Sequence, residues 1–204
     1  MISLSLCNVK KFFNNRKVID DISLNVFSPF CLGIIGKNGV GKSTLIKIIA
    51  GILEPTFGKV EYRLESEKIE LSQLLPRIGF VAPYLNLYDE FTALENVLIY
   101  DEIRGLKKKE ADYNEILKKV DLFERRKDLL KIFSSGMKQR LKIAVALSNN
   151  PNLLLLDEPS QNLDESGIQM IHDIVDEYKK KSIVIICSND KNDYHLFDET
   201  IKLN

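Results

Sequence analysis

The nine residues Gly36-Lys37-Asn38-Gly39-Val40-Gly41-Lys42-Ser43-Thr44 match the pattern G-x-x-x-x-G-K-S/T. They follow an apolar run that ends at Ile35 and precede a helical pattern at residues 45–50. In this context, glycines let backbone N–H groups turn inward around phosphate oxygens, and the helix N-terminus adds partial positive charge. Lys42 is suited to neutralise β- and γ-phosphate oxygens, and Ser43 offers its hydroxyl to Mg²⁺. The residues expected to contact a nucleotide are Gly36, Asn38, Gly39, Gly41, Lys42, Ser43 and Thr44.

Strand-length apolar runs alternate with helical patterns around this loop, as expected of a mainly parallel sheet covered by crossover helices. Residues 2–26 differ, because their apolar positions are broken by charged turns, and they predict antiparallel strands beside that sheet. Helical spacing between residues 85 and 131 predicts a small helical subdomain. The expected fold class is therefore α/β, with an N-terminal antiparallel β portion. The expected parallel strands are residues 30–35, 77–82, 153–156 and 182–187.

The length of 204 residues is typical of one domain. We expect a nucleotide-binding core formed by residues 1–84 and 132–204, with the helical subdomain between them. Lys plus Arg and Asp plus Glu each total 29, so the formal net charge of zero argues against nucleic acid as a partner. Three scattered cysteines without a C-x-x-C pair favour a reducing compartment. No stretch approaches the roughly 20 apolar residues of a membrane span, so a membrane role is expected only through a partner.

Two acidic residues, Asp157 and Glu158, end the apolar run at residues 153–156. Carboxylates at the buried end of a strand are costly unless they meet a metal ion or another partner. We therefore assign Asp157 to the Mg²⁺ shell, through water. Glu158 points the other way and is assigned as the base that accepts a proton from a water attacking the γ-phosphate. The alternative is that both acids only cap the loop before Pro159.

A serine- and glycine-containing segment, Phe133-Ser134-Ser135-Gly136-Met137-Lys138-Gln139-Arg140, precedes a helical pattern that runs to residue 147. Alone it is an ordinary helix cap, although such a helix start can also hold an anion. Ser160-Gln161-Asn162-Leu163-Asp164 follows the acidic pair. This order of phosphate loop, helical lobe, serine–glycine segment and acidic strand resembles the ATP-binding cassette (ABC) ATPases. The resemblance covers essentially the whole chain and includes residues 51–58 and 87–96.

The resemblance implies an ATPase that uses ATP and Mg²⁺ and that pairs head to tail, either with a second copy or with a paralogue. Each ATP would lie between the phosphate loop of one subunit and Ser134 and Gly136 of the other. Asp164 would lie at the dimer seam. Phe13 stands at the position of the family's aromatic residue that stacks on adenine, and the alternative is a buried strand residue.

Three positions depart from the family pattern. The serine–glycine signature has Ser135 and Met137 in place of its first glycine and its glutamine. Pro83 stands where a glutamine commonly reaches toward Mg²⁺ and the attacking water. Asn189 stands where a histidine is typical. Its amide can donate to a γ-phosphate oxygen but cannot carry positive charge, so we expect slower hydrolysis.

Other charged residues receive ordinary interpretations. The run Lys107-Lys108-Lys109 is expected to be a solvated turn between two helices. His195, six residues after Asn189, is expected at the surface at a loop end. His172 lies beside the apolar face of a helical stretch at residues 168–178, and we expect a structural role for it.

The leading hypothesis is a cytoplasmic ATPase subunit, peripheral on the inner face of the cell membrane, that drives a separate transmembrane permease. The compact chain ends soon after residue 203, so no appended regulatory domain is expected. Together with its signature this resembles small exporters of the haem or multidrug type, so export is favoured over import. The nucleotide site does not encode the cargo or the identity of the permease. Two alternatives stay open: a soluble ABC protein of cluster assembly, and a nucleotide-gated module that hardly hydrolyses ATP because of Pro83 and Asn189.

Overall fold

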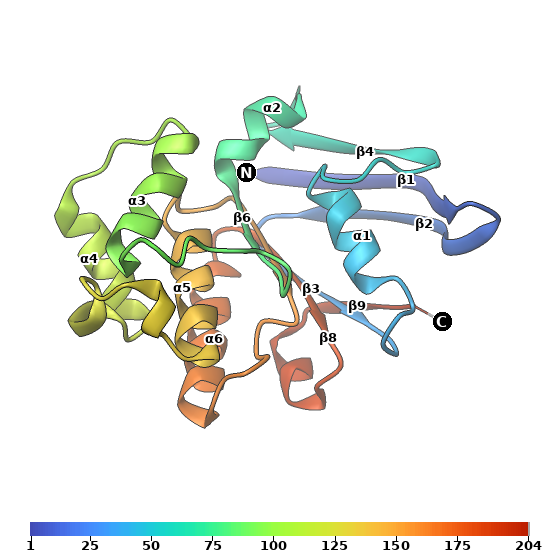
Figure 1. Cartoon of the computed structure of the whole chain (residues 1–204). Helices are drawn as coiled ribbons and strands as arrows, with labels where there is room; N and C mark the ends of the chain where they lie inside the picture. The colour runs from blue at the N-terminus through green and yellow to red at the C-terminus, as the bar shows by residue number, and fades with distance from the viewer. Residues whose placement is uncertain (204) are drawn as a thin grey trace.

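The computed structural model describes residues 1–203 and contains two β-sheets (Figure 1). Four antiparallel strands pair in the order β2-β1-β4-β5, and five parallel strands pair in the order β6-β7-β8-β3-β9. The antiparallel strands are β1 (Ile2–Phe13), β2 (Arg16–Phe27), β4 (Phe57–Leu64) and β5 (Glu67–Ile69). The parallel strands are β3 (Phe30–Ile35), β6 (Ile78–Val81), β7 (Leu153–Asp157), β8 (Ile183–Ser188) and β9 (Glu199–Lys202).

The parallel sheet separates two hydrophobic cores because its central strands are buried on both faces. Successive side chains of a strand point to opposite faces. Leu153 and Leu155 therefore pack with the antiparallel sheet and α1, whereas Leu154 and Leu156 pack with α5 and α6. Figure 1 shows α1 between the two sheets, and α5 and α6 on the other side of the parallel sheet, to its left in this view. The helices are α1 (Lys42–Ile49), α2 (Leu71–Leu74), α3 (Ala93–Ile103), α4 (Glu110–Lys119), α5 (Ser135–Leu147) and α6 (Glu165–Tyr178).

The helical subdomain contains α3 and α4, at one end of the molecule (Figure 1). A buried polar cluster joins it to the C-terminal end of α5. The Asp101 carboxylate, which is fully buried, accepts hydrogen bonds from Ser148 Oγ at 2.5 Å and from Arg104 Nη1 at 3.2 Å. The same Arg104 nitrogen donates to the carbonyl of Val145 at 2.9 Å. Both partners of the ion pair are thus bound to α5, and α3 is fixed to that helix.

Most predicted elements are confirmed within two residues, and the differences have physical causes. The helix after the phosphate loop begins at Lys42 rather than at residue 45. Strands β4, β5 and β9 were not predicted, because they lie at or near sheet edges and present mostly half-buried or exposed side chains. Residues 107–109 lie in the turn between α3 and α4, as predicted, with Lys107 and Lys109 exposed. Lys108 is half-buried, because its ammonium donates to the carbonyl of Ser148 at the end of α5.

Within residues 1–203, every helix is too short or too polar to span a lipid bilayer.

Candidate functional site

The loop between β3 and α1 has a backbone conformation that requires glycine. Gly41, the residue before α1, has a φ of 116°, and a Cβ there would lie 3.0 Å from the carbonyl oxygen of Val18. Helix α1 begins at the next residue, Lys42. The first N–H groups of a helix have no partners within it, so they open toward the loop and give this end partial positive charge. The segment is therefore built to bind an anion.

The Lys42 side chain lies at the centre of the site and is almost completely buried. Its ammonium donates to the carbonyl of Gly36 at 2.9 Å and to Oδ1 of Asn189 at 2.8 Å. Oε1 of Glu158 lies 3.3 Å from the same nitrogen. These three oxygens match the three donors of an ammonium group. Lys42 thus connects the phosphate loop to residues that follow β7 and β8.

A hollow of about 410 Å³ brings together most of the residues predicted to bind nucleotide. Phe13 at the end of β1 lines it and is 46% exposed, so the alternative that Phe13 is a buried strand residue is wrong. Glu158, Arg16 and Val18 line it as well. The predicted loop residues that line it are Asn38, Gly39, Gly41, Lys42, Ser43 and Thr44.

Asp157 is fully buried, and within residues 1–203 neither of its carboxylate oxygens has a hydrogen-bond partner. Burial raises the pKa of this carboxyl above its ordinary value, and the nearby Ser43 hydroxyl and the ammoniums of Lys42 and Lys47 oppose that rise. A buried carboxylate without partners is costly in a folded protein. Its position at the end of β7, beside the first turn of α1, makes it a candidate ligand for a cation.

Glu158 follows Asp157 but leaves the strand in the left-handed region, with a φ of 48°. This conformation is rare for a residue with a branched or long side chain, and it is typical of functional sites. The backbone N–H of Glu158 still donates to the carbonyl of Cys187 at 3.0 Å. The turn separates the two acids, so that the Glu158 carboxylate reaches the Lys42 ammonium.

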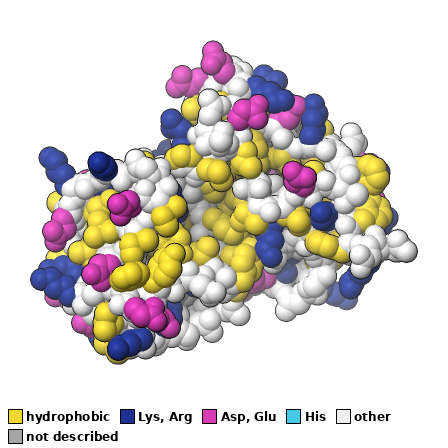
Figure 2. Space-filling view, turned by 45° about the horizontal axis from the view of Figure 1, so that its top comes forward, with side chains coloured by type: hydrophobic (Ala, Val, Ile, Leu, Met, Phe, Trp, Pro, Cys, Tyr) yellow, Lys and Arg dark blue, Asp and Glu magenta, His cyan; other side chains and the backbone are white. Residues whose placement is uncertain are grey.

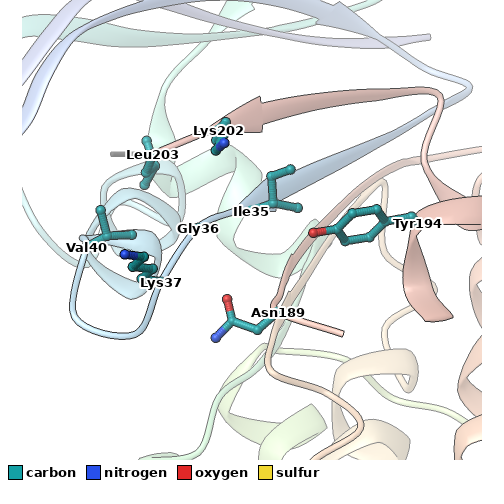
Figure 3. A pocket seen from close by; sticks show the side chains of 8 residues that line it. All are labelled: Ile35, Gly36, Lys37, Val40, Asn189, Tyr194, Lys202 and Leu203. Atoms are coloured by element: carbon teal, nitrogen blue, oxygen red, sulfur yellow. The ribbon is translucent and has the colours of Figure 1, made fainter. Parts of the chain in front are cut away.

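A second hollow of about 640 Å³ adjoins the first and shares Asn38 and Glu158 with it. Pro83 and Asn189 line this hollow. The Asn189 amide nitrogen donates to Oδ1 of Asn38, while its oxygen accepts from Lys42. Asn189 also lines a neighbouring pocket, and Figure 3 shows its side chain there, below Gly36 and Lys37 of the phosphate loop. Two of the three departures from the family pattern, Pro83 and Asn189, therefore border the same space as the predicted base.

Helix α5 begins with the signature residues, and Ser134 and Gly136 among them line neither of the two hollows beside Lys42. Ser134 caps the helix, and its Oγ accepts from the N–H of Met137 at 3.2 Å. Asp164 caps α6 in the same way and accepts from the N–H of Gly167 at 2.9 Å. Among the residues that the structure describes, the two hollows beside Lys42 do not include Ser134, Gly136 or Asp164. Their roles in a partner's site stay predictions.

Sequence reasoning missed two residues of α5 that connect it to the site. The Gln139 side chain is buried, and its amide donates to the carbonyl of Pro159 at 2.9 Å, directly after Glu158. The Lys142 ammonium donates to the carbonyls of Ala82 and Pro83 at 3.3 and 3.0 Å, and partial burial lowers its pKa. Both lie within or just after the quoted signature. Their only sequence signal is polarity on a helix that is otherwise mostly apolar.

Comparisons with known proteins agree with this geometry. Residues 19–161 match the family model described as ABC transporter. The bacitracin transport ATP-binding protein BcrA of Bacillus licheniformis is 38% identical over 89% of this chain, and the chain spans only 60% of BcrA. The lantibiotic transport ATP-binding protein SrtF of Streptococcus pyogenes is 35% identical, with coverage of 91% of this chain and 79% of SrtF. The Nod factor export ATP-binding protein I of Bradyrhizobium diazoefficiens is 33% identical, with coverage of 83% and 56%.

Among solved structures, a dimeric ATP-binding cassette in a post-hydrolysis state with ADP and Pi superimposes with a TM-score of 0.87. It is 27% identical, and the match covers 98% of this chain and 94% of that one. The likeness confirms the predicted fold class, including the antiparallel β portion and the helical subdomain.

Proposed function

Because this chain belongs to the ABC transporter family and has the fold of its ATPase cassettes, we propose that it is the ATP-hydrolysing subunit of an export system. The membrane permease would be a separate chain, and this subunit would lie on the cytoplasmic side of the membrane, bound to it. The observation that carries the proposal is the convergence of the phosphate loop, Lys42 and Glu158 on one hollow, with the buried Asp157 carboxylate directly before Glu158 at the end of β7. The word export in a relative's name supports the direction of transport.

The contacts of Lys42 offer a way to activate the base only when ATP is present. The Lys42 ammonium contacts oxygens of Gly36, Asn189 and Glu158. Phosphate oxygens carry more negative charge than these acceptors, so they compete for the same donors. Once the Lys42 ammonium donates to phosphate oxygens, Glu158 loses its cation partner and becomes free to take a proton from water. Asn189 is released at the same time and offers its N–H₂ to the phosphate.

Ser43 and Asp157 fit the Mg²⁺ that the family uses. Asp157 supplies two buried oxygens without partners, and Ser43 supplies a hydroxyl at the start of α1. Among residues 1–203 no group of three or more His, Cys, Asp and Glu side chains is placed so that it could hold a metal ion by itself. A site with so few protein ligands is typical of Mg²⁺ that is held partly by nucleotide phosphates. When bound, Mg²⁺ neutralises charge on the phosphate oxygens.

The complete site requires a second subunit in our proposal. Ser134 and Gly136 stand at the N-terminus of α5, where they suit an anion, but they do not line the hollow beside Lys42 of their own chain. A second copy or a paralogue would supply them from the opposite side, with Asp164 near the seam. The exposed ring of Phe13 would stack on adenine at the far end of the hollow. ATP would then hold two subunits together, and hydrolysis would release them.

The helical subdomain offers the surface for the permease. Figure 2 shows hydrophobic side chains gathered over this part of the molecule, at the left of the view. Tyr88, Phe91 and Leu98 are each between 37% and 43% exposed there. An exposed apolar group of this kind is typical of an interaction site. Deletion of the permease gene should move the subunit from the membrane fraction to the soluble fraction, and an unchanged soluble complex would favour a role away from the membrane.

Phosphate release by the purified protein with Mg²⁺ and ATP tests the enzymatic part. We expect turnover that Lys42→Ala removes. Glu158→Gln should abolish hydrolysis but keep ATP bound, so that a dimer accumulates in size-exclusion chromatography. Turnover no higher than that of Lys42→Ala, with the permease also present, would refute the ATPase proposal.

A second candidate, the nucleotide-gated module, is favoured by one observation. Pro83 has no side-chain donor, and Asn189 carries no charge, although both border the hollow beside Glu158. This candidate predicts dimers that form with ATP and persist for hours without phosphate release.

A further inference from the structure

We propose that His172 and Asp193 are positioning residues that hold Asn189 in place for hydrolysis. The proposal rests on the function given above and assigns a role to a buried polar chain that no motif of the family accounts for. This series of polar side chains runs from α6, through the 3₁₀ turn Lys191–Leu196, to the end of β8.

Three side chains form a continuous series of hydrogen bonds. Ser188 Oγ donates to Oδ2 of Asp193 at 2.5 Å. The other oxygen of that carboxylate, Oδ1, lies 3.1 Å from Nε2 of His172. A carboxylate only accepts, so His172 carries its proton on Nε2. The side chains of His172 and Asp193 are 12% and 4% exposed, so these bonds are protected from competing water.

The series ends at the Ser188 hydroxyl, which contacts the residues on both sides of Asn189. Ser188 immediately precedes Asn189, and its Oγ also accepts from the backbone N–H of Asp190 at 3.0 Å. One hydroxyl therefore fixes the residue before Asn189 and the residue after it. Because Asp193 and His172 fix that hydroxyl, they determine where the Asn189 amide lies.

Accurate placement matters more for asparagine than for a charged switch residue. Asn189 contributes only hydrogen bonds, which weaken steeply when the donor is misaligned. Its amide now contacts Lys42 and Asn38, the groups that ATP must engage. An error in the backbone at residues 188–190 would therefore reduce its contribution to the transition state while leaving the phosphate loop intact.

The same series of hydrogen bonds also connects Asn189 to the helix that Asp164 caps. Helix α6 carries His172 two turns after that cap. A shift of α6 on dimer formation would thus move the acceptor that holds Ser188. In this arrangement the switch residue responds to the dimer seam through side chains of its own subunit.

Steady-state ATPase kinetics of the full chain test the proposal. Asp193→Asn and His172→Leu should each lower kcat about tenfold and change the KM for ATP less than twofold, because Lys42 and the loop keep their contacts. His172→Gln should recover at least half of the kcat, since its amide N–H₂ can donate to Asp193 in place of Nε2. His195→Gln is the matched control. The centroid of the His195 ring lies 5.0 Å from that of His172, but among residues 1–203 the His195 ring hydrogen-bonds only to the carbonyl of Asn192, so wild-type kinetics are expected.

A double-mutant cycle separates positioning from simple loss of structure. In an Asn189→Ala background, Asp193→Asn should lower kcat less than twofold further, because the residue that it positions is gone. Ser188→Ala, a smaller change, gives the same test if Asp193→Asn does not fold. Multiplicative losses, or equal losses for His172→Gln and His172→Leu, would overturn the inference. Absence of turnover in the wild type would instead overturn the proposed function itself, so the two failures are distinct.

Discussion

Replacing Asp157 by asparagine should make the nucleotide-free protein more stable while it weakens Mg²⁺-dependent ATP binding. The carboxylate is fully buried, and within residues 1–203 neither oxygen is hydrogen-bonded. Asparagine has the same shape but no charge. An unsatisfied buried polar group costs about 1–3 kcal/mol, more when it is charged. Because the new amide is also unpaired, the substitution removes only the part of the burial cost that comes from the charge. We therefore expect the free energy of unfolding to rise by about 1 kcal/mol.

The pH dependence of this gain follows from the raised pKa of Asp157. Below an unfolded pKa near 3.8 the carboxyl is protonated in both states, and its burial costs little. As the pH rises through that value toward the higher folded pKa, the unfolded state ionises first and the folded state is penalised. Above the folded pKa the penalty is constant. The gain in the free energy of unfolding should therefore be small at pH 3, already rising at pH 4, and complete at pH 8.

Thermal unfolding followed by circular dichroism in EDTA measures the effect. A gain of 1 kcal/mol corresponds to a Tm rise of about 2–4 °C for a chain of this size. Glu158→Gln is the matched control: that carboxylate is one-third exposed and paired with Lys42, so no comparable gain is expected. With Mg²⁺ and ATP at 100 times Kd, binding adds about 2.7 kcal/mol to the wild type, most of which the Asp157 variant should lose. A lower Tm for Asp157→Asn at pH 8 without nucleotide would refute the reasoning.

Three further predictions concern hydrolysis, ATP affinity and stability. Asn189→His should raise kcat several-fold in the phosphate-release assay, because an imidazole can add positive charge beside the γ-phosphate. An unchanged or lower kcat would contradict the assignment of Asn189 as the switch residue. Phe13→Ala should raise the KM for ATP about tenfold at similar kcat, as expected for loss of base stacking at about 1–3 kcal/mol, whereas Phe57→Ala, an exposed ring outside the hollow, should not. Arg104→Met should lower the free energy of unfolding by about 3–5 kcal/mol in urea titrations, since it leaves the Asp101 charge buried without its cation; a loss below 1 kcal/mol would show that Ser148 alone satisfies that carboxylate.

The sequence predicted the phosphate loop and the parallel strands because both follow from local patterns. The loop needs glycine and lysine at fixed spacing, and β7 and β8 are uninterrupted apolar runs. Local patterns do not reveal where a side chain ends after the chain has folded. The contacts of Gln139 with Pro159 and of His172 with Asp193 join residues 20 and 21 positions apart.

The exposed strands β5 and β9 escaped prediction for a related reason. Their short sequences have no apolar periodicity, and pairing with a neighbouring strand determines their conformation. The left-handed conformation of Glu158 was equally hidden, because glutamate has no special preference for it. The sequence did predict that this residue and Asp157 point in different directions, since adjacent residues of a strand face opposite sides.

The Asp101–Arg104 ion pair of α3 holds the C-terminal end of α5, so a movement of α3 would tilt α5 as a rigid rod. Its thirteen residues extend roughly 20 Å at 1.5 Å per residue, from Ser134 at one end to the Asp101 cluster at the other. A tilt of about 10° at the clamped end would displace the serine by roughly 3 Å, which is the full length of a hydrogen bond. A movement of α3 would thus be transmitted through the rigid helix α5 to the Ser134 hydroxyl. A small rotation of α3 would be enough to form or break a hydrogen bond between that hydroxyl and an anion.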